Sequence, residues 1–246
     1  MQATLLIQKL QEDAALAPLL PLLVSGQQDG LWLTARELQH PETLAPLLKD
    51  FSTEEGWPGG DGRAIASLWS RWHFAAVLSP WVAALLLHRH TPVLQAIQLS
   101  PQHKTCGVAW EPVVPALEPV SAQTACEQIV QQMQPLIESL HKVSRTSPRV
   151  FWSNLGNLLE YLVQQLREHP GASPKVLQAF ENLLTSPSLS DGKPNPLQQP
   201  VRDVPAPAAD TGCTCRVRKI CCLYYLLPGT SLCENCPRPA PAHQHV

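Results

Sequence analysis

Six of the eight cysteines in this 246-residue chain lie between positions 213 and 236. An extracellular domain stabilised by disulfides normally distributes its cysteines through the fold. Met1–Ser25 has no basic start, and its apolar residues are spaced rather than continuous, so we expect no secretory signal and a cytoplasmic protein. In such a chain the cysteine cluster indicates metal or redox chemistry rather than disulfide bonds.

The charge of the chain limits the class of partner. The net charge is −2 and only 15% of residues are charged, which argues against a nucleic-acid binder that works through bulk positive charge. The longest apolar stretch, Phe74–Leu87, contains Ser79 and Pro80 and is shorter than the roughly 18 residues that span a bilayer. We therefore predict no transmembrane segment and leave peripheral membrane contact open. The expected partners are small molecules or proteins.

Residues 1–185 are predicted to form a helical body, because apolar residues recur there at helical spacing. Val93–Leu99 and Cys106–Trp110 flank a polar turn and predict one β-hairpin. Three Ser-Pro pairs are predicted to open helices: Ser79-Pro80, Ser147-Pro148 and Ser173-Pro174. The predicted fold class is mainly α with one small β-hairpin (α+β).

The composition changes after residue 185. Residues 186–212 contain six prolines and few large apolar residues, which predicts an extended linker or a long surface loop. This stretch would separate the helical body, 1–185, from a cysteine segment, 213–246. The sequence thus predicts three parts, with the metal or redox chemistry in the last.

Four of the clustered cysteines have the spacing C-C-x10-C-x2-C: Cys221, Cys222, Cys233 and Cys236. A C-x2-C turn lets two thiolates converge on one metal, whereas two adjacent cysteines can do so only if the backbone bends locally. Two sulfide-bridged irons need four terminal thiolates, which this segment supplies. A structural zinc site also uses four cysteines, although an adjacent pair is a poor half of such a site. Spacing alone leaves iron–sulfur, zinc and free or disulfide-bonded thiols open.

Four basic residues lie around the cysteine pairs, and we expect their positive charge to lower the pKa of the thiols and to favour a reduced, more negative cluster. They are Arg216, Arg218, Lys219 and Arg238. Cys213 and Cys215 form a C-x-C just upstream. Three roles are open for them: spare thiols, a redox-active pair or alternative ligands. No glycine-rich dinucleotide motif follows a predicted strand, so the electrons are expected to come from an external donor.

Other residues are weaker candidates. Arg71–His73 are a candidate cleft lining, although Trp72 is also expected in the core. Asn154 and Asn157, one helical turn apart, would present amides on a functional helix face or lie on a solvated one. Cys106 and Cys126 are expected to be small core residues.

The C-C-x10-C-x2-C pattern resembles the signature of the FhuF-type ferric-siderophore reductases. The likeness extends to Arg218–Tyr225, Arg-Lys-Ile-Cys-Cys-Leu-Tyr-Tyr, and to Cys233–Pro237, Cys-Glu-Asn-Cys-Pro. A weaker likeness is Phe151–Asn154, which is similar to the family's Trp-x-Asn helix start. The sequence departs from the family in two ways. Cys213 and Cys215 are not part of the family motif, and the proline-rich stretch 186–212 looks like an insertion.

The resemblance implies a [2Fe-2S] cluster on Cys221, Cys222, Cys233 and Cys236. It also implies a helical body related to the C-terminal domain of siderophore synthetases. The cluster would pass one electron to ferric iron in a hydroxamate-type siderophore in the cytoplasm, and reduction would release the iron, because hard oxygen donors prefer Fe(III). Two alternatives are a zinc-stabilised binding or interaction protein, and an iron–sulfur electron carrier without siderophore activity.

Overall fold

The computed structural model describes residues 3–20, 30–110, 121–205 and 214–238. The helices of these residues are α1 (Ala3–Glu12), α2 (Pro41–Glu54), α3 (Gly62–His88), α4 (Ala122–Ser144), α5 (Pro148–Leu166) and α6 (Pro174–Thr185). The strands are β1 (Leu31–Thr34), β2 (Leu94–Leu99), β3 (Thr105–Trp110), β4 (Val201–Pro205) and β5 (Thr214–Arg218). Short 3-10 helices cover Glu37–Gln39 and Tyr224–Leu226. The predicted class, mainly α with one small β-hairpin (α+β), is confirmed, and the described residues contain two small antiparallel sheets.

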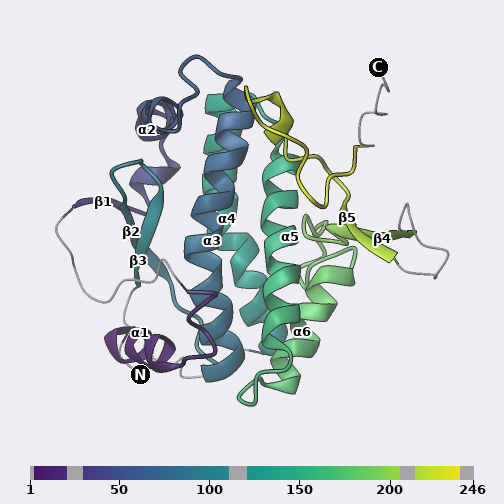
Figure 1. Ribbon diagram of the computed structural model, residues 1–246. Helices are drawn as coiled ribbons and strands as arrows, with labels where there is room; N and C mark the ends of the chain where they lie inside the picture. Colours follow the sequence, from purple (N-terminus) through teal and green to yellow (C-terminus); the bar gives the residue numbers. More distant parts are fainter. Residues whose placement is uncertain (1–2, 21–29, 111–120, 206–213, 239–246) are drawn as a thin grey trace.

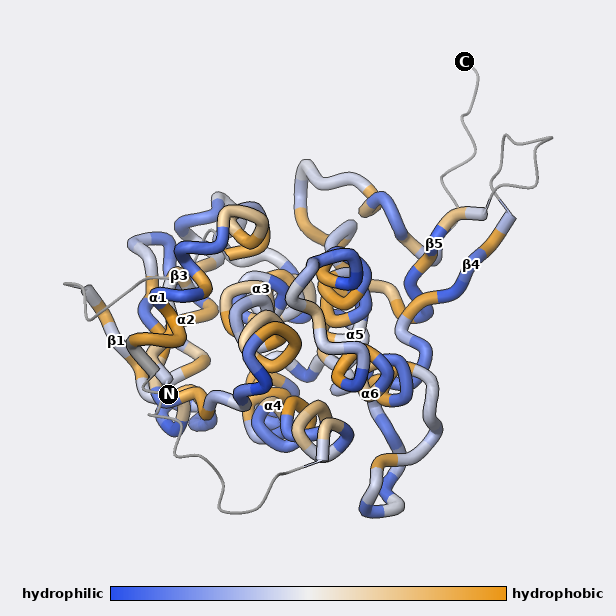
Figure 2. Tube along the Cα trace, turned by 90° about the horizontal axis from the view of Figure 1, so that it is seen from below, coloured by the Kyte–Doolittle hydropathy of each residue, from blue (hydrophilic) through white to orange (hydrophobic). Residues whose placement is uncertain are grey.

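Helix α3 is the central element (Figure 1). It packs against α4 and α5, and its second half is buried nearly all round, as expected for a helix whose apolar residues are not confined to one stripe. Figure 2 shows the apolar residues of α3, α4 and α5 turned toward one another. Among the described residues, no helix is both long and apolar enough to cross a bilayer.

The predicted helix start at Ser79-Pro80 is wrong, because α3 continues through Pro80 to His88. Proline removes one backbone hydrogen bond from a helix, but the packing of α3 against its neighbours on all sides holds the helix together there. The other two Ser-Pro predictions are confirmed. Helix α5 begins at Pro148 and α6 at Pro174, in both cases after a serine N-cap residue.

The predicted hairpin is confirmed as β2 and β3, which pair antiparallel. Two features were not predicted. Strand β1 pairs with β2 and completes a three-stranded sheet, and its four residues are too few to show an alternating pattern. Strands β4 and β5 form a second antiparallel pair, with Val201 opposite Arg218 and Pro205 opposite Thr214.

Residues 186–205 of the predicted proline-rich linker are packed against the helices. Leu197 is fully buried, and the Asn195 side-chain amide donates to the Ser186 carbonyl at 2.9 Å. Pro200 lies against Gly156 of α5. These residues therefore form a folded surface loop followed by β4, not a free linker. Residues 206–212 lie outside the described residues, and the division into three domains stays a prediction.

Candidate functional site

The first of the four spaced cysteines, Cys221, comes shortly after the end of β5 at Arg218. Directly after the Cys221-Cys222 pair, Leu223 has a φ of 64°, in the left-handed region that a non-glycine residue rarely adopts. The Leu223 amide donates to the Cys221 sulfur at 3.4 Å. This is the local bend that two adjacent cysteines need if both are to face one site. Gly229, with a φ of 73°, helps the chain to turn back toward Cys233.

The structure brings the four predicted cysteines near one another. The sulfurs of Cys222 and Cys233 are 3.6 Å apart, and Cys236 lies close enough to Cys221 to raise the pKa of its thiol. Among the described residues, no three ligand side chains are as yet close enough together to hold one metal ion. Two thiolates on one tetrahedral metal, with bonds of about 2.3 Å, lie about 3.8 Å apart, so Cys222 and Cys233 already have the spacing of a metal-bound pair. Two pairs of thiolates are the donor set that a two-iron cluster takes.

The four cysteines differ in their exposure. Cys222 is buried, whereas Cys221, Cys233 and Cys236 are each partly exposed. The backbone amide of Cys236 donates to the Cys233 carbonyl at 3.0 Å, which closes the C-x2-C turn. The site therefore has an inner side against the helical body and an outer side near the surface.

The remaining cysteines lie elsewhere or outside the described residues. Cys215 is exposed on β5, opposite Val204, and Cys213 falls outside the described residues. Cys126 is fully buried in α4, as predicted for a core residue. Cys106 is only partly buried on β3, where its thiol donates to the Gln98 carbonyl at 3.4 Å.

Arg218 lies buried behind the sulfurs. Its side chain is 2% exposed, one guanidinium N–H donates to the Asn154 side-chain oxygen, and its Nε has no hydrogen-bond partner among the described residues. Burial lowers the pKa of Arg218, while Cys222 and Cys233, as neighbouring thiolates, oppose that shift. An arginine still stays charged, so its counter-charge here must come from the cysteine side.

The pKa of Cys222 is lowered to about 5. Its sulfur accepts a hydrogen bond from Cys233 and another from the Tyr224 amide, and it lies in the field of Arg218 and Arg71. The same shared proton raises the pKa of Cys233. Negative charge is thus best stabilised on the pair formed by Cys222 and Cys233, which suits a thiolate-ligated cluster.

Asn154 connects two helices to the cysteine segment. Its side-chain NH2 donates to the hydroxyls of Ser67 and Ser70 at 2.9 and 3.1 Å, and the Ser67 hydroxyl donates to the Cys222 carbonyl at 2.7 Å. Asn154 is 3% exposed, so the prediction of a solvated helix face is wrong for this residue. Asn157 accepts a hydrogen bond at 2.8 Å from the side-chain amide of Asn235, which lies between Cys233 and Cys236 in the sequence.

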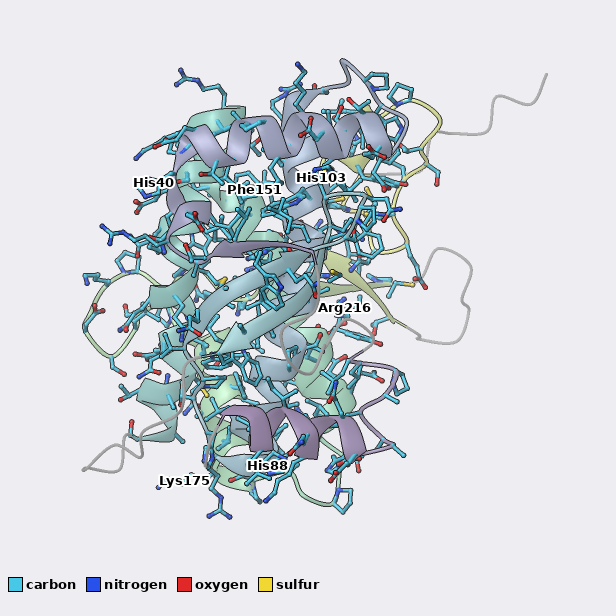
Figure 3. All side chains as sticks on the ribbon, turned by 90° about the vertical axis from the view of Figure 1, so that its left-hand side faces the viewer. His40, His88, His103, Phe151, Lys175 and Arg216 are labelled. Atoms are coloured by element: carbon cyan, nitrogen blue, oxygen red, sulfur yellow. The ribbon has the colours of Figure 1, made fainter. Side chains whose placement is uncertain are left out.

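Arg216 and Arg238, two of the other predicted basic residues, are engaged away from the sulfurs. Arg216 forms an ion pair with Glu160 of α5, and it is labelled in Figure 3 beside the two-stranded sheet. The guanidinium of Arg238 lies 4.2 Å from the centre of the Tyr225 ring. The first contact holds the segment on the body, and the second lies within the segment. Arg218 is left as the buried cation behind the cysteines.

Arg71–His73 do not line one cleft. His73 is fully buried, and burial lowers its pKa to about 3. Trp72 is 39% exposed, with the Lys104 ammonium 4.5 Å from its ring centre, so the prediction that it belongs to the core is wrong. Of these three residues only Arg71 affects the cysteines, because its positive charge helps to lower the pKa of Cys222.

Sequence reasoning missed a cleft of about 580 Å³ next to the cysteine segment. It is formed by the start of α5, by the loop and first strand residues 195–202, and by Lys219 and Ile220. Arg149, Arg202 and Lys219 contribute positive charge to its lining. No local pattern could have revealed it, because its three walls come from segments far apart in the sequence.

Two family models match this chain. Residues 98–210 match the ferric iron reductase FhuF-like transporter family, and residues 218–238 match the FhuF 2Fe-2S C-terminal domain. No curated protein matches. The second match runs from Arg218 through the four spaced cysteines, and four thiols with a buried, partly unpartnered cation behind them fit a negatively charged cluster. The chain belongs to the FhuF-type ferric iron reductase family, iron–sulfur oxidoreductases with a [2Fe-2S] cofactor.

Proposed function

We propose that this protein reduces ferric iron held in a siderophore, of the hydroxamate type, in the cytoplasm. Cys221, Cys222, Cys233 and Cys236 would hold the [2Fe-2S] cluster, and an external donor would supply the electrons. The observation that carries this proposal is the grouping of the four cysteines, with the Cys222 and Cys233 sulfurs 3.6 Å apart, in front of the buried guanidinium of Arg218. The family match supports the same reading.

The chemistry suits iron release. When bound, the cluster supplies single electrons, and one electron converts Fe(III) to Fe(II). Hydroxamate oxygens are hard donors that hold Fe(III) more firmly than Fe(II), so reduction weakens the chelate and frees the iron.

The residues of the chain have separate tasks in this scheme. Ser67 and Asn154 fix the backbone of Cys222 against α3 and α5, in a region that excludes water. Arg218 compensates the negative charge of the thiolates from the inner side. Cys221 and Cys236 remain partly exposed, which leaves the outer side of the site within reach of a ferric chelate at the surface.

Iron and sulfide analysis of anaerobically purified protein, with an EPR spectrum of the reduced state, tests the cofactor site. We expect about two irons and two sulfides per chain and a spectrum of a reduced [2Fe-2S] centre. A colourless protein with one zinc and no labile sulfide would refute the proposed iron–sulfur cluster.

Mixing the reduced protein with a ferric trihydroxamate then tests the activity. We expect the cluster absorption to return to that of the oxidised form as Fe(II) appears in a ferrozine trap. A cluster that stays reduced with every ferric chelate would leave an electron carrier without siderophore activity.

A further inference from the structure

We propose that the cleft between the start of α5, residues 195–202 and Lys219-Ile220 is the binding site for the ferric siderophore, and that it selects chelates with negative charge. The proposal rests on the proposed function and adds a site and a specificity to it. It starts from the position of the cleft, because Lys219 and Ile220 line it and are followed directly by Cys221 and Cys222.

The cleft shares its inner wall with the cysteine segment. The Ser153 hydroxyl, in the first turns of α5, donates to the Ile220 carbonyl at 3.4 Å, and the Lys219 amide donates to the Pro200 carbonyl at 3.0 Å. These contacts tie Lys219 and Ile220, the two residues before Cys221, to the other two walls. A ligand in the cleft would therefore lie beside the cysteine segment rather than on a remote face.

The cleft carries positive charge on each of its three walls. Arg149 comes from α5, Arg202 from β4 and Lys219 from the cysteine segment, and none of the residues lining the cleft is acidic. Lys219 has a neutral partner, the side-chain oxygen of Gln199 at 2.9 Å. The N-terminus of α5 adds the positive end of the helix dipole. The cleft thus attracts an anion and repels a cation.

The size and composition of the cleft suit a metal chelate. A volume of about 580 Å³ lies within the range of small-molecule sites, which is about 300–1,000 Å³. The half-buried ring of Trp152 offers one flat apolar surface, and the exposed side chain of Gln198 offers an amide oxygen. Such a lining accommodates an organic chelate with polar oxygens at its surface.

The charge of a ferric chelate depends on its donors. Three hydroxamates neutralise Fe(III), so their complex has a neutral iron centre. A siderophore that combines two hydroxamates with an α-hydroxycarboxylate keeps excess negative charge around the iron. Because the cleft is cationic, we expect the mixed hydroxamate–carboxylate chelate to bind more tightly than the neutral trihydroxamate.

Binding is best measured with gallium(III) complexes, which have the charge and size of the ferric ones but are not reduced. Isothermal titration of the cluster-loaded protein would compare a citrate-based dihydroxamate complex with a linear trihydroxamate complex. The variant is Arg149→Gln/Arg202→Gln, which leaves Lys219 and the cysteines unchanged. The control is Lys175→Gln, an exposed cation on α6 that Figure 3 shows at the lower end of the molecule, away from Arg216.

We expect the double variant to lose about tenfold in affinity for the anionic gallium complex, with little change for the neutral one. The Lys175→Gln control should bind both like the wild type, and added salt should weaken only the anionic complex. Equal affinities for both complexes, an unaffected double variant or no binding at all would each overturn the proposed site. Reduction of ferric chelates by the wild type would still uphold the proposed function in those cases, so the two can fail separately.

Discussion

The protein has two basic regions on either side of its cysteine segment, and they differ in depth. Behind the cysteines, Arg218 is buried and donates to Asn154, and no carboxylate of the described residues forms an ion pair with it. Beside them, Arg149 and Arg202 are exposed in the cleft, where water screens their charge. A buried charge acts strongly on whatever lies against it, whereas an exposed charge acts mainly on a ligand that displaces water. The first region is therefore suited to stabilise the cluster, and the second to attract the chelate.

The largest effect is expected when a cluster ligand is removed, because the cluster is the group that the buried Arg218 would stabilise. Replacing Cys222 or Cys233 by serine should reduce the iron and sulfide content several-fold, because a two-iron cluster needs all four thiolates. Cys106→Ser on β3 is the matched control and should keep a full cluster. Metal and sulfide analysis with visible absorption gives the readout.

The same measurement on Cys213→Ser/Cys215→Ser decides the role of the upstream pair. Cys215 is exposed on β5, and we expect the double variant to retain its cluster. Loss of the cluster there would show that the proposed ligand set is wrong.

Arg218→Gln tests the buried region directly. A cation a few ångströms from the cluster in a partly buried site is worth roughly 2–4 kcal/mol, so its removal should lower the reduction potential by roughly 100 mV. Redox titration followed by EPR measures the shift. Arg218→Lys keeps the charge and should shift the potential much less. It also provides a second measurement if the Arg218→Gln protein does not fold. An unchanged potential in a cluster-loaded Arg218→Gln protein would contradict the assigned role.

The sequence was most informative where the signal is local. The spacing of Cys221, Cys222, Cys233 and Cys236, and the Ser-Pro starts of α5 and α6, can be read within a few residues. The contact between Asn154 and Arg218 joins residues 64 positions apart, and nothing local marks either as a buried partner of the other. Pro80 was misread because the packing around α3, which the sequence does not show, overrides a local helix breaker.

A second buried base sharpens the comparison, because His73 is buried like Arg218 but is neutral. Its pKa is lowered to about 3 by burial, while in the unfolded chain it is about 6.5. Below pH 6.5 the unfolded chain therefore binds a proton that the folded protein does not, so stability falls as the pH falls toward 3. This residue alone should destabilise the protein by about 2 kcal/mol between pH 7 and pH 5.

Chemical denaturation at several pH values measures this effect. His73→Gln should show a shallower loss of unfolding free energy below pH 6.5 than the wild type. His40→Gln, at an exposed residue labelled in Figure 3, should keep the wild-type slope. Identical slopes for all three proteins would show that His73 is not buried as a neutral base.

The smallest expected effect concerns the wall of the cleft. A Cβ on Gly156 would lie 2.8 Å from the Pro200 Cβ, closer than two carbon atoms can approach without a shift. Alanine favours a helix over glycine by about 1 kcal/mol, but moving Pro200 costs more, so Gly156→Ala should lower the unfolding free energy by about 1 kcal/mol. Because the Pro200 carbonyl accepts from the Lys219 amide, the same variant should also bind the anionic gallium complex a few-fold more weakly. Gly62→Ala, with open space around it at the start of α3, should raise the unfolding free energy by at most about 1 kcal/mol and leave binding unchanged. A Gly156→Ala protein with normal stability but weakened binding would show that the loop shifts at little energetic cost, and that its position matters to the cleft alone.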